Sequence, residues 1–509
     1  MFCLTQKHVF HISVNINLVQ DTFLDKLNER SELTASFNER LGPIILMIII
    51  GIIVAAIPLW AIRKKLLSKQ KDLIFISFWY QTWILINLIP TINCIFPESN
   101  FAFPPHQAAG RIIQFSNDQV VMYAELQLLI LLLFHFPLFY FYKRCSHVSG
   151  KPPAISKSAE TRIIGSKLLM LFFFYSVFGI LYLGVAVRTG ALSGYAVNVD
   201  FFLTMNIADR MIWRIYQLSS PFLLGIIILA YAEQRVKKKY YLILLLPGFL
   251  TNMTAFLISS RTYALYLVLS IILVLAVRGH INLSSIRSVL IAISVLAFSM
   301  YIFSAIPRIR RAALEPGTTI VEALKNLNPL NQKFESLPID YGFRLDGIEL
   351  MVLATPYLIN KGLVPLSWYI IPIISPILPL MPSLEEEYKV NLKIADFKMR
   401  YLEAYTPVPT PDYPSVSLTE FYMLMGPIGF LLCSIIQGSA IAITTKSLRK
   451  SDGRKNIFAI FLLFQVFFFE SSLISVFTGW IRALPILLIA LFLNPWKVKK
   501  PLRQLGSGG

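Results

Sequence analysis

Long runs of apolar residues dominate the chain, and the polar residues gather in the segments between them. The runs at 44–62, 73–96, 168–187 and 288–306 contain almost no charged side chain. About 20 apolar residues cross the hydrocarbon core of a bilayer as a helix. The pattern therefore predicts an all-α, polytopic membrane protein. We expect eleven spans, at 43–62, 73–96, 120–142, 167–187, 212–232, 240–259, 262–277, 288–306, 418–444, 456–479 and 481–496.

The composition excludes the other broad classes of protein. Of the 509 residues, 56% are hydrophobic and only 15% are charged, and the mean hydropathy is +0.63. A soluble domain has about 45–50% apolar and about 25% charged residues. Soluble enzymes, secreted disulfide scaffolds and disordered proteins are therefore excluded. The four cysteines share no CxxC spacing, so we expect neither a disulfide framework nor a zinc site.

The positive charge of the chain follows its predicted topology. The net charge is +19, and 26 of the 47 Lys and Arg residues lie in six segments that alternating spans place on one side, with only four of the 28 acidic residues. An excess of Lys and Arg marks the cytoplasmic side of a membrane protein. Orientation thus explains the charge, and no nucleic-acid partner is expected. The six segments are 63–72, 143–167, 233–239, 278–287, 446–455 and 497–503.

This topology divides the chain into five parts. Residues 1–42 form a tail that lies outside or on the membrane surface, and 43–306 contain the first eight spans. A large extracytoplasmic loop follows at 307–417, and 418–496 contain the last three spans. Residues 497–509 form a basic cytoplasmic tail whose final Gly-Ser-Gly-Gly has the composition of an appended linker.

Arginines stand at several points of the predicted outer face, against the orientation bias. Arg261 occupies a short hairpin between two spans, Arg210 lies at the outer end of the fifth span, and the large loop opens with Arg308, Arg310 and Arg311. A guanidinium group matches phosphate oxygens in two-point contact, so these residues could hold a diphosphate. Contact with lipid headgroups or a salt bridge with Glu315 is the alternative for the loop cluster.

Carboxylates form a second group of candidates. Asp346 and Glu349 are three residues apart, with Arg344 shortly before them, and Glu420 opens the span that follows the large loop. A carboxylate in this position could act as a general base. The alternatives are a structural pair of Arg344 with a carboxylate, and for Glu420 a helix start capped by a neighbouring Ser or Thr.

Ionisable residues inside the predicted spans give no chain that resembles a proton path. They are Glu125, His135, Glu470 and Arg482. Glu470 and Arg482 could pair between neighbouring helices. His135 is expected to make a hydrogen bond in the core.

Two short motifs resemble a known family. A span begins at Ser260-Arg261, and the span after the large loop begins with Glu420 and Tyr422 and continues to a Gly426-x-x-Gly429 turn. Together with the late outer loop, these motifs resemble the O-antigen polymerase (Wzy) and oligosaccharide repeat-unit polymerase group, whose architecture the O-antigen ligases share. The Ile-Pro-Arg element of that loop is matched only by Ile371-Pro372, without the Arg.

The resemblance implies a glycosyltransferase of the GT-C type in the bacterial cytoplasmic (inner) membrane, with the large loop in the periplasm. Such an enzyme transfers a growing glycan from undecaprenyl diphosphate to a lipid-linked oligosaccharide repeat unit on the outer face. The resemblance also implies inversion at the sugar carbon and no cofactor. A flippase and a chain-length regulator of the same pathway are the expected partners, besides membrane lipid.

The candidate residues receive roles under this resemblance. Asp346 is the first candidate for the base and Glu420 the second, with Arg261 and Arg344 completing the catalytic group. The outer loop contains no Asp-x-Asp pair, so no metal site is expected. The diphosphate would be held by Arg261, Arg308, Arg310, Arg311, Arg344 and Arg210, and the glycan by Tyr341, Glu349 and Tyr422.

Three other functions remain open from the sequence. A ligase would use the same diphosphate site with a different acceptor. The outer loop contains no persuasive candidate His, which favours the polymerase over the ligase. A transporter or flippase for lipid-linked oligosaccharide would place its charges in a central cavity, whereas here they gather at the outer face. A purely structural membrane partner is the last.

Overall fold

The computed structural model describes residues 39–95, 116–147, 161–163, 165–188, 206–233, 269, 271–281, 285–287, 290–291, 293–294, 346–364, 366, 416–449, 453–466 and 473–498. Everything below concerns these residues. They form helices almost throughout, as the sequence predicts for a helical membrane protein.

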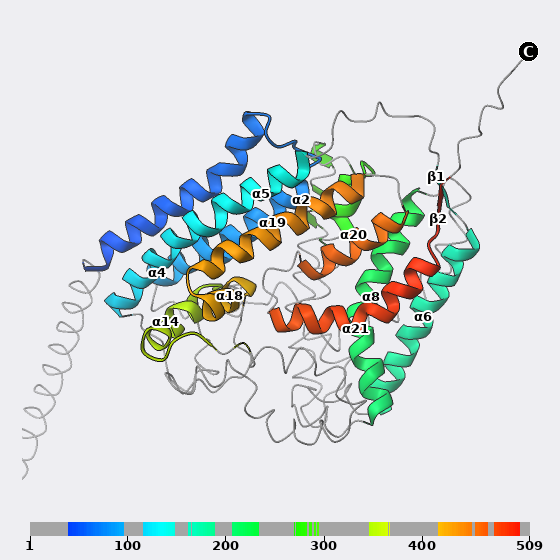
Figure 1. The fold of residues 1–509 in the computed structure, drawn as a ribbon. Coiled ribbons are helices and arrows are strands. Elements are labelled where there is room, and N and C mark those ends of the chain that lie inside the picture. Colours follow the sequence, from blue (N-terminus) through cyan, green and yellow to red (C-terminus); the bar gives the residue numbers. More distant parts are fainter. Residues whose placement is uncertain are drawn as a thin grey trace, which may run out of the picture.

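A first group of long helices lies side by side in Figure 1. Helix Glu39–Arg63 comes first, and the next two helices each contain one π-helical turn. α19 packs along α5, where Gly438 lies so close to α5 that a Cβ atom would be 2.8 Å from the Leu138 carbonyl oxygen. The elements are α2 (Leu73–Trp83), η1 (Ile84–Leu88), α3 (Ile89–Ile95), α4 (Asn117–Ile130), η3 (Leu131–His135), α5 (Phe136–His147) and α19 (Ile428–Arg449).

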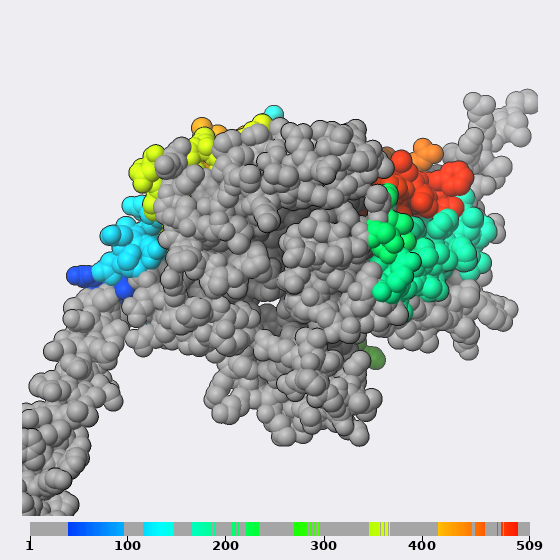
Figure 2. Space-filling view, turned by 90° about the horizontal axis from the view of Figure 1, so that it is seen from below, coloured from blue at the N-terminus to red at the C-terminus, as the bar shows by residue number. Residues whose placement is uncertain are grey.

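A second group consists of α6 (Gly165–Arg188), α8 (Ile207–Glu233), α20 (Gly453–Val466) and α21 (Leu473–Phe492). α20 packs on α19 and on α8, so it joins the two groups. Phe222 of α8 meets Phe461 of α20 edge to face, with ring centroids 5.5 Å apart. Seen from below, α4 and α14 lie at one edge and α6, α8 and α21 at the other (Figure 2). The short strands β1 (Thr161–Ile163) and β2 (Trp496–Val498) pair antiparallel.

Five described helices are long and apolar enough to cross a membrane. They are Glu39–Arg63, Leu73–Ile95, Asn117–Ser146, Gly165–Val185 and Ile428–Arg449. α8 and α21 coincide with two further predicted spans. The predicted spans at 240–259, 262–277 and 288–306 lie wholly or largely outside the described residues, so the total of eleven stays a prediction.

Two predicted boundaries were wrong. The span expected at 418–444 is two helices, α18 (Ser417–Met425) and α19, separated by a turn at Gly426, whose φ is +61°. The boundary expected near residue 480 lies inside α21, which already begins at Leu473. Both boundaries were set from hydropathy alone, which carried one span across Gly426 although the Gly426-x-x-Gly429 motif marks a turn there.

Each π-helical turn comes just before a proline. In η1 the Ile89 amide bonds the Ile84 carbonyl, and residue 90 is a proline, which has no N–H to donate. The carbonyls of Leu85 and Ile86 therefore lose their usual partners. They accept instead from the Gly347 amide at 2.8 Å and from Gln127 Nε2 at 3.3 Å. The same sequence order, a π turn and then Pro137, occurs at η3.

Hydrogen bonds gather the basic segments at one end of the helices. Arg449 Nη2 donates to Asp72 Oδ1 at 2.8 Å, and Tyr142 also donates to Asp72. Because Asp72 precedes α2 and Arg449 ends α19, these contacts bring the segments 63–72 and 446–455 together.

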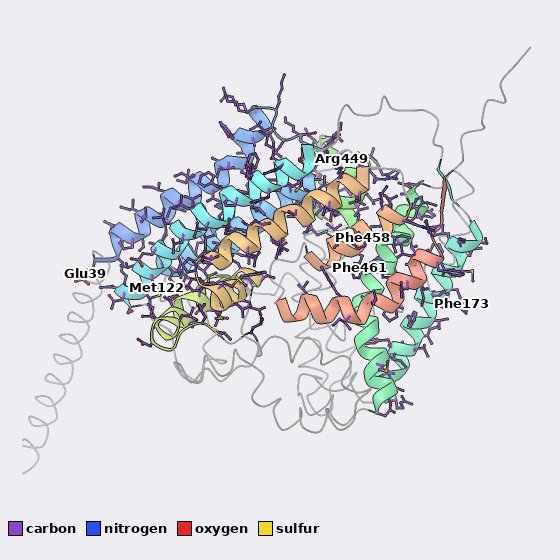
Figure 3. The ribbon with its side chains drawn as sticks, viewed as in Figure 1. Glu39, Met122, Phe173, Arg449, Phe458 and Phe461 are labelled. Carbon is purple, nitrogen blue, oxygen red and sulfur yellow. The ribbon has the colours of Figure 1, made fainter. Side chains whose placement is uncertain are left out.

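The other basic segments meet at the same end. Arg278 Nε donates to Glu233 at 2.6 Å, and its Nη1 donates to the Leu448 carbonyl at 3.0 Å. Trp496 Nε1 also donates to Glu233, at 2.6 Å, and the β1–β2 pair sets Arg162 opposite Lys497. Four of the six basic segments are thus linked by direct contacts, and the other two, paired through β1 and β2, are joined to them through Trp496. In Figure 3, Arg449 lies at the end opposite to Glu39 and Met122.

Gly438 allows the close packing of α19 on α5, and its replacement tests that packing. We expect Gly438→Ala to lower the apparent unfolding temperature of the detergent-solubilised protein, because an added methyl group meets the Leu138 carbonyl at 2.8 Å and overpacking costs about 1–3 kcal/mol. Gly184→Ala in α6 is the matched control, since nothing lies within 4 Å of its Cβ position. An unfolding temperature for Gly438→Ala equal to that of the control would contradict the packing described.

Candidate functional site

Two short helices, α14 (Glu349–Lys361) and α18, stand at the end of the first group that lies opposite the basic segments (Figure 1). α14 packs on α4 and on α18, and α18 leads directly into α19. The sequence placed α14 in a large outer loop at 307–417. Residues 346–354 are largely buried against the helix ends.

Asp346 anchors the start of α14. Its Oδ1 accepts hydrogen bonds from the backbone amides of Ile348 at 3.2 Å and Glu349 at 2.9 Å. Its Oδ2 accepts from Asn93 Nδ2 at 2.9 Å and from the Tyr123 hydroxyl at 3.1 Å. A carboxylate offers about four acceptor positions, so these four donors occupy it. Asp346 therefore holds the start of α14, whose N-cap is Ile348, and ties it to α3 and α4.

Gly347 joins this anchor to α18. Its amide donates to the Leu85 carbonyl freed by Pro90, and its carbonyl accepts from Thr419 Oγ1 at 3.0 Å. A Cβ atom at this position would be 3.1 Å from the Leu85 oxygen, so glycine permits the close approach. Thr419 was predicted as a possible helix cap. The structure shows that Val416 is the N-cap of α18 and that no side-chain cap bond is formed.

Three carboxyl groups are brought to this junction and buried. Asp346 is 1% exposed, and Glu349 and Glu420 are both fully buried. Glu349 lies in the first turn of α14 and Glu420 in the first turn of α18. Because the Gly347–Thr419 bond joins the residue after Asp346 to the residue before Glu420, the two helix starts converge there. The positive end of a helix dipole stabilises a carboxylate in its first turn.

Tyr422 lies one turn further along α18. Its hydroxyl is 3.1 Å from Thr355 Oγ1 of α14, and its ring stacks on Phe430 with centroids 5.1 Å apart. The predicted Gly-x-x-Gly turn produces this stack. Gly429 lies so close to Phe421 that a Cβ atom would overlap its carbonyl, which brings the start of α19 against α18.

Burial raises the pKa of Asp346 from an ordinary 3.8 to about 6. The hydrogen bonds from Asn93, Tyr123 and the two backbone amides act in the opposite direction. The ionisable groups of the described neighbouring elements at this end include Glu39, Arg40, Cys94, Asp118, Tyr123, Glu349, Glu420 and Tyr422. Among the residues that the structure describes, no three His, Cys, Asp or Glu side chains are grouped to hold a metal ion.

Most of the predicted cations lie outside the described residues. They are Arg261, Arg308, Arg310, Arg311 and Arg344, and the predicted glycan contact Tyr341 lies outside as well. Arg210 is placed in the first turns of α8 next to Asp209, which pairs with Arg188, but its side chain is not described. Glu470 also lies outside. His135 does make a core hydrogen bond, to the Ile130 carbonyl at 3.2 Å.

Sequence reasoning missed three residues of the junction, Asn93, Tyr123 and Gly347, and gave Thr419 a different role. Asn93 and Tyr123 contact Asp346 across 253 and 223 residues of sequence. The only signal was an Asn in the last turn of an otherwise apolar span, at the predicted outer end, where a buried polar side chain needs a partner.

No family model matches the chain, and neither a curated protein nor a solved structure was found to be similar to it. The chain is a helical membrane protein, and its function has to be argued from the junction itself.

The titration of Asp346 should be visible in the stability of the protein. Because its pKa is raised in the folded state, its contribution to stability is complete below about pH 4 and is lost as the pH rises through about 6. We therefore expect the unfolding temperature of the wild type, relative to Asp346→Asn, to fall by a few degrees between pH 4 and pH 7. The control is Asp118→Asn at an exposed position in α4. A wild-type-minus-variant difference that is constant with pH would contradict the raised pKa.

Proposed function

We propose that the protein is a polysaccharide polymerase. It transfers a growing glycan from undecaprenyl diphosphate to a lipid-linked oligosaccharide repeat unit at the outer face of the bacterial inner membrane. The observation that carries the proposal is the convergence of Asp346, Glu349 and Glu420, buried at the helix ends opposite to the basic segments. If the basic end is cytoplasmic, as its charge indicates, the carboxylates lie at the outer face.

The geometry suits Asp346 and Glu420 to different roles. The oxygens of Asp346 are occupied by four donors, so its part is to hold α14 in place. Glu420, fully buried in the first turn of α18, becomes the better candidate for the base. It takes the proton of the acceptor hydroxyl, whose oxygen forms the new bond to the sugar carbon. The bond from that carbon to the diphosphate breaks, and its electron pair leaves with the diphosphate.

Two further features support this chemistry. The predicted outer arginines would stabilise the charge that grows on the leaving diphosphate, where one lost contact of this kind costs about 2.7–4 kcal/mol. The burial of the carboxylates keeps water from the reacting centre, which matters for a transferase because water would compete with the acceptor hydroxyl. No metal or cofactor has a part in this mechanism.

A glycan ladder from a deletion strain tests the function and the base. Complementation with Glu420→Gln or Arg261→Ala should leave single repeat units in place of long chains, with protein abundance near normal, because a base or a diphosphate contact is lost. Glu125→Gln, an exposed glutamate in α4, is the control and should restore long chains. Long chains from Glu420→Gln would exclude it as the base, and unligated polymer in the empty deletion strain would indicate a ligase.

The reaction should proceed without a metal ion. We expect the purified protein, given only lipid-diphosphate repeat units and EDTA, to lengthen them at the rate seen without chelator. The products can be resolved by gel electrophoresis after release of the glycan. Elongation that stops with EDTA and returns with added divalent cation would contradict the metal-free mechanism.

A further inference from the structure

Asn93 has one polar atom that the protein uses and one that it does not. Its side chain is 1% exposed, and its Nδ2 donates to Asp346 Oδ2 at 2.9 Å. Its Oδ1 is buried and has no hydrogen-bond partner among the described residues. A buried polar atom left without a partner costs about 1–3 kcal/mol. The junction therefore holds an acceptor that a donor from a bound molecule would satisfy.

Comparison with Tyr123 shows which property of the Asn93 side chain is not needed to hold Asp346. Both Asn93 and Tyr123 donate to the same oxygen of Asp346, so a hydroxyl-bearing side chain can fill this structural role. The Tyr123 hydroxyl donates and accepts through one oxygen, whereas the amide of Asn93 adds a separate acceptor atom, Oδ1, that has no partner among the described residues. Asn93 therefore provides a hydrogen-bond acceptor that is not needed to hold Asp346 in place.

The charge of the surrounding carboxyl groups determines which kind of ligand can bind at Asn93. Asp346, Glu349 and Glu420 are gathered at this junction, so an anionic group such as a phosphate would be repelled. A neutral group with an O–H to donate fits an amide oxygen beside carboxylates. The hydroxyl groups of a glycan have this chemistry, as they both donate and accept hydrogen bonds.

We propose that Asn93 is a glycan-binding residue, whose amide oxygen accepts a hydrogen bond from a hydroxyl group of the acceptor repeat unit. The inference rests on the proposed function and assigns the acceptor subsite within it. Because Asn93 is buried, the glycan enters by opening the junction of α14 and α18. Backbone bonds such as that from Val364 to the Met423 carbonyl, 3.1 Å long, hold this junction closed.

A pair of variants separates glycan binding from support of Asp346. Asn93→Leu and Tyr123→Phe each remove one donor to Asp346 Oδ2, but only Asn93→Leu also removes the amide oxygen Oδ1 that has no partner among the described residues. With purified protein and lipid-diphosphate repeat units, we expect KM for the repeat unit to rise about three- to tenfold in Asn93→Leu, the effect of one neutral hydrogen bond. In Tyr123→Phe we expect KM near the wild-type value, with a comparable decrease of kcat in both.

Two more variants keep the result interpretable. Asn87→Leu removes another buried amide of the same continuous helix, six residues earlier, and should leave KM unchanged. Asn93→Ser retains an acceptor oxygen and replaces Asn93→Leu if the latter is not monodisperse; its KM should rise less than threefold. An unchanged KM in Asn93→Leu, or an equal rise in Tyr123→Phe, overturns the inference and leaves the polymerase standing. A wild-type protein that lengthens nothing overturns both.

Discussion

The missing amide hydrogen of Pro90 is the constraint on which the junction depends. Inside a membrane protein every backbone carbonyl needs a partner, and a proline in a helix leaves carbonyls of the preceding turn without one. Here the π-helical turn presents the Leu85 and Ile86 carbonyls to Gly347 and Gln127. A defect in one helix thus becomes the docking point for a segment more than 250 residues away, as the Asn93–Asp346 bond beside it confirms.

The two ends of the first helix group differ in the partners of their carboxylates. At one end, Asp72 and Glu233 each pair with an arginine and with a ring donor, so their charge is neutralised by direct contacts. At the other end, carboxyl groups are buried on convergent helix starts, and Asp346 is held by neutral donors alone. Neutralised carboxylates suit a structural role. At Asp346, burial raises the pKa, whereas the hydrogen bonds that it accepts lower it.

The sequence was informative where local pattern decides the structure and silent where distant contacts do. Apolar runs predicted the five described spans, and the charge of the segments between them predicted which ends meet. Glu349 begins α14, and Asp346 lies three residues before it, outside the helix. Asn93 and Tyr123 escaped because no local pattern reveals a partner in another span. The Gly426-x-x-Gly429 turn was predicted, but the division of the span into two helices there was not, because the hydropathy on both sides is the same.

The hydrogen bonds that Arg278 and Trp496 donate to Glu233 constrain the order in which the protein can be assembled. Trp496 donates to Glu233 across 263 residues, and β2 pairs with β1 from an equally remote part of the chain. During synthesis, α6 and α8 are therefore in the bilayer long before the indole that covers Glu233 has been made. Until then, Arg278 alone can shield that carboxylate. The second helix group is thus the last part of the described fold to complete its contacts. In a stalled nascent chain, Glu233 would lack its hydrogen bond from Trp496, and this end of the helices would be exposed to the quality-control proteases of the cell.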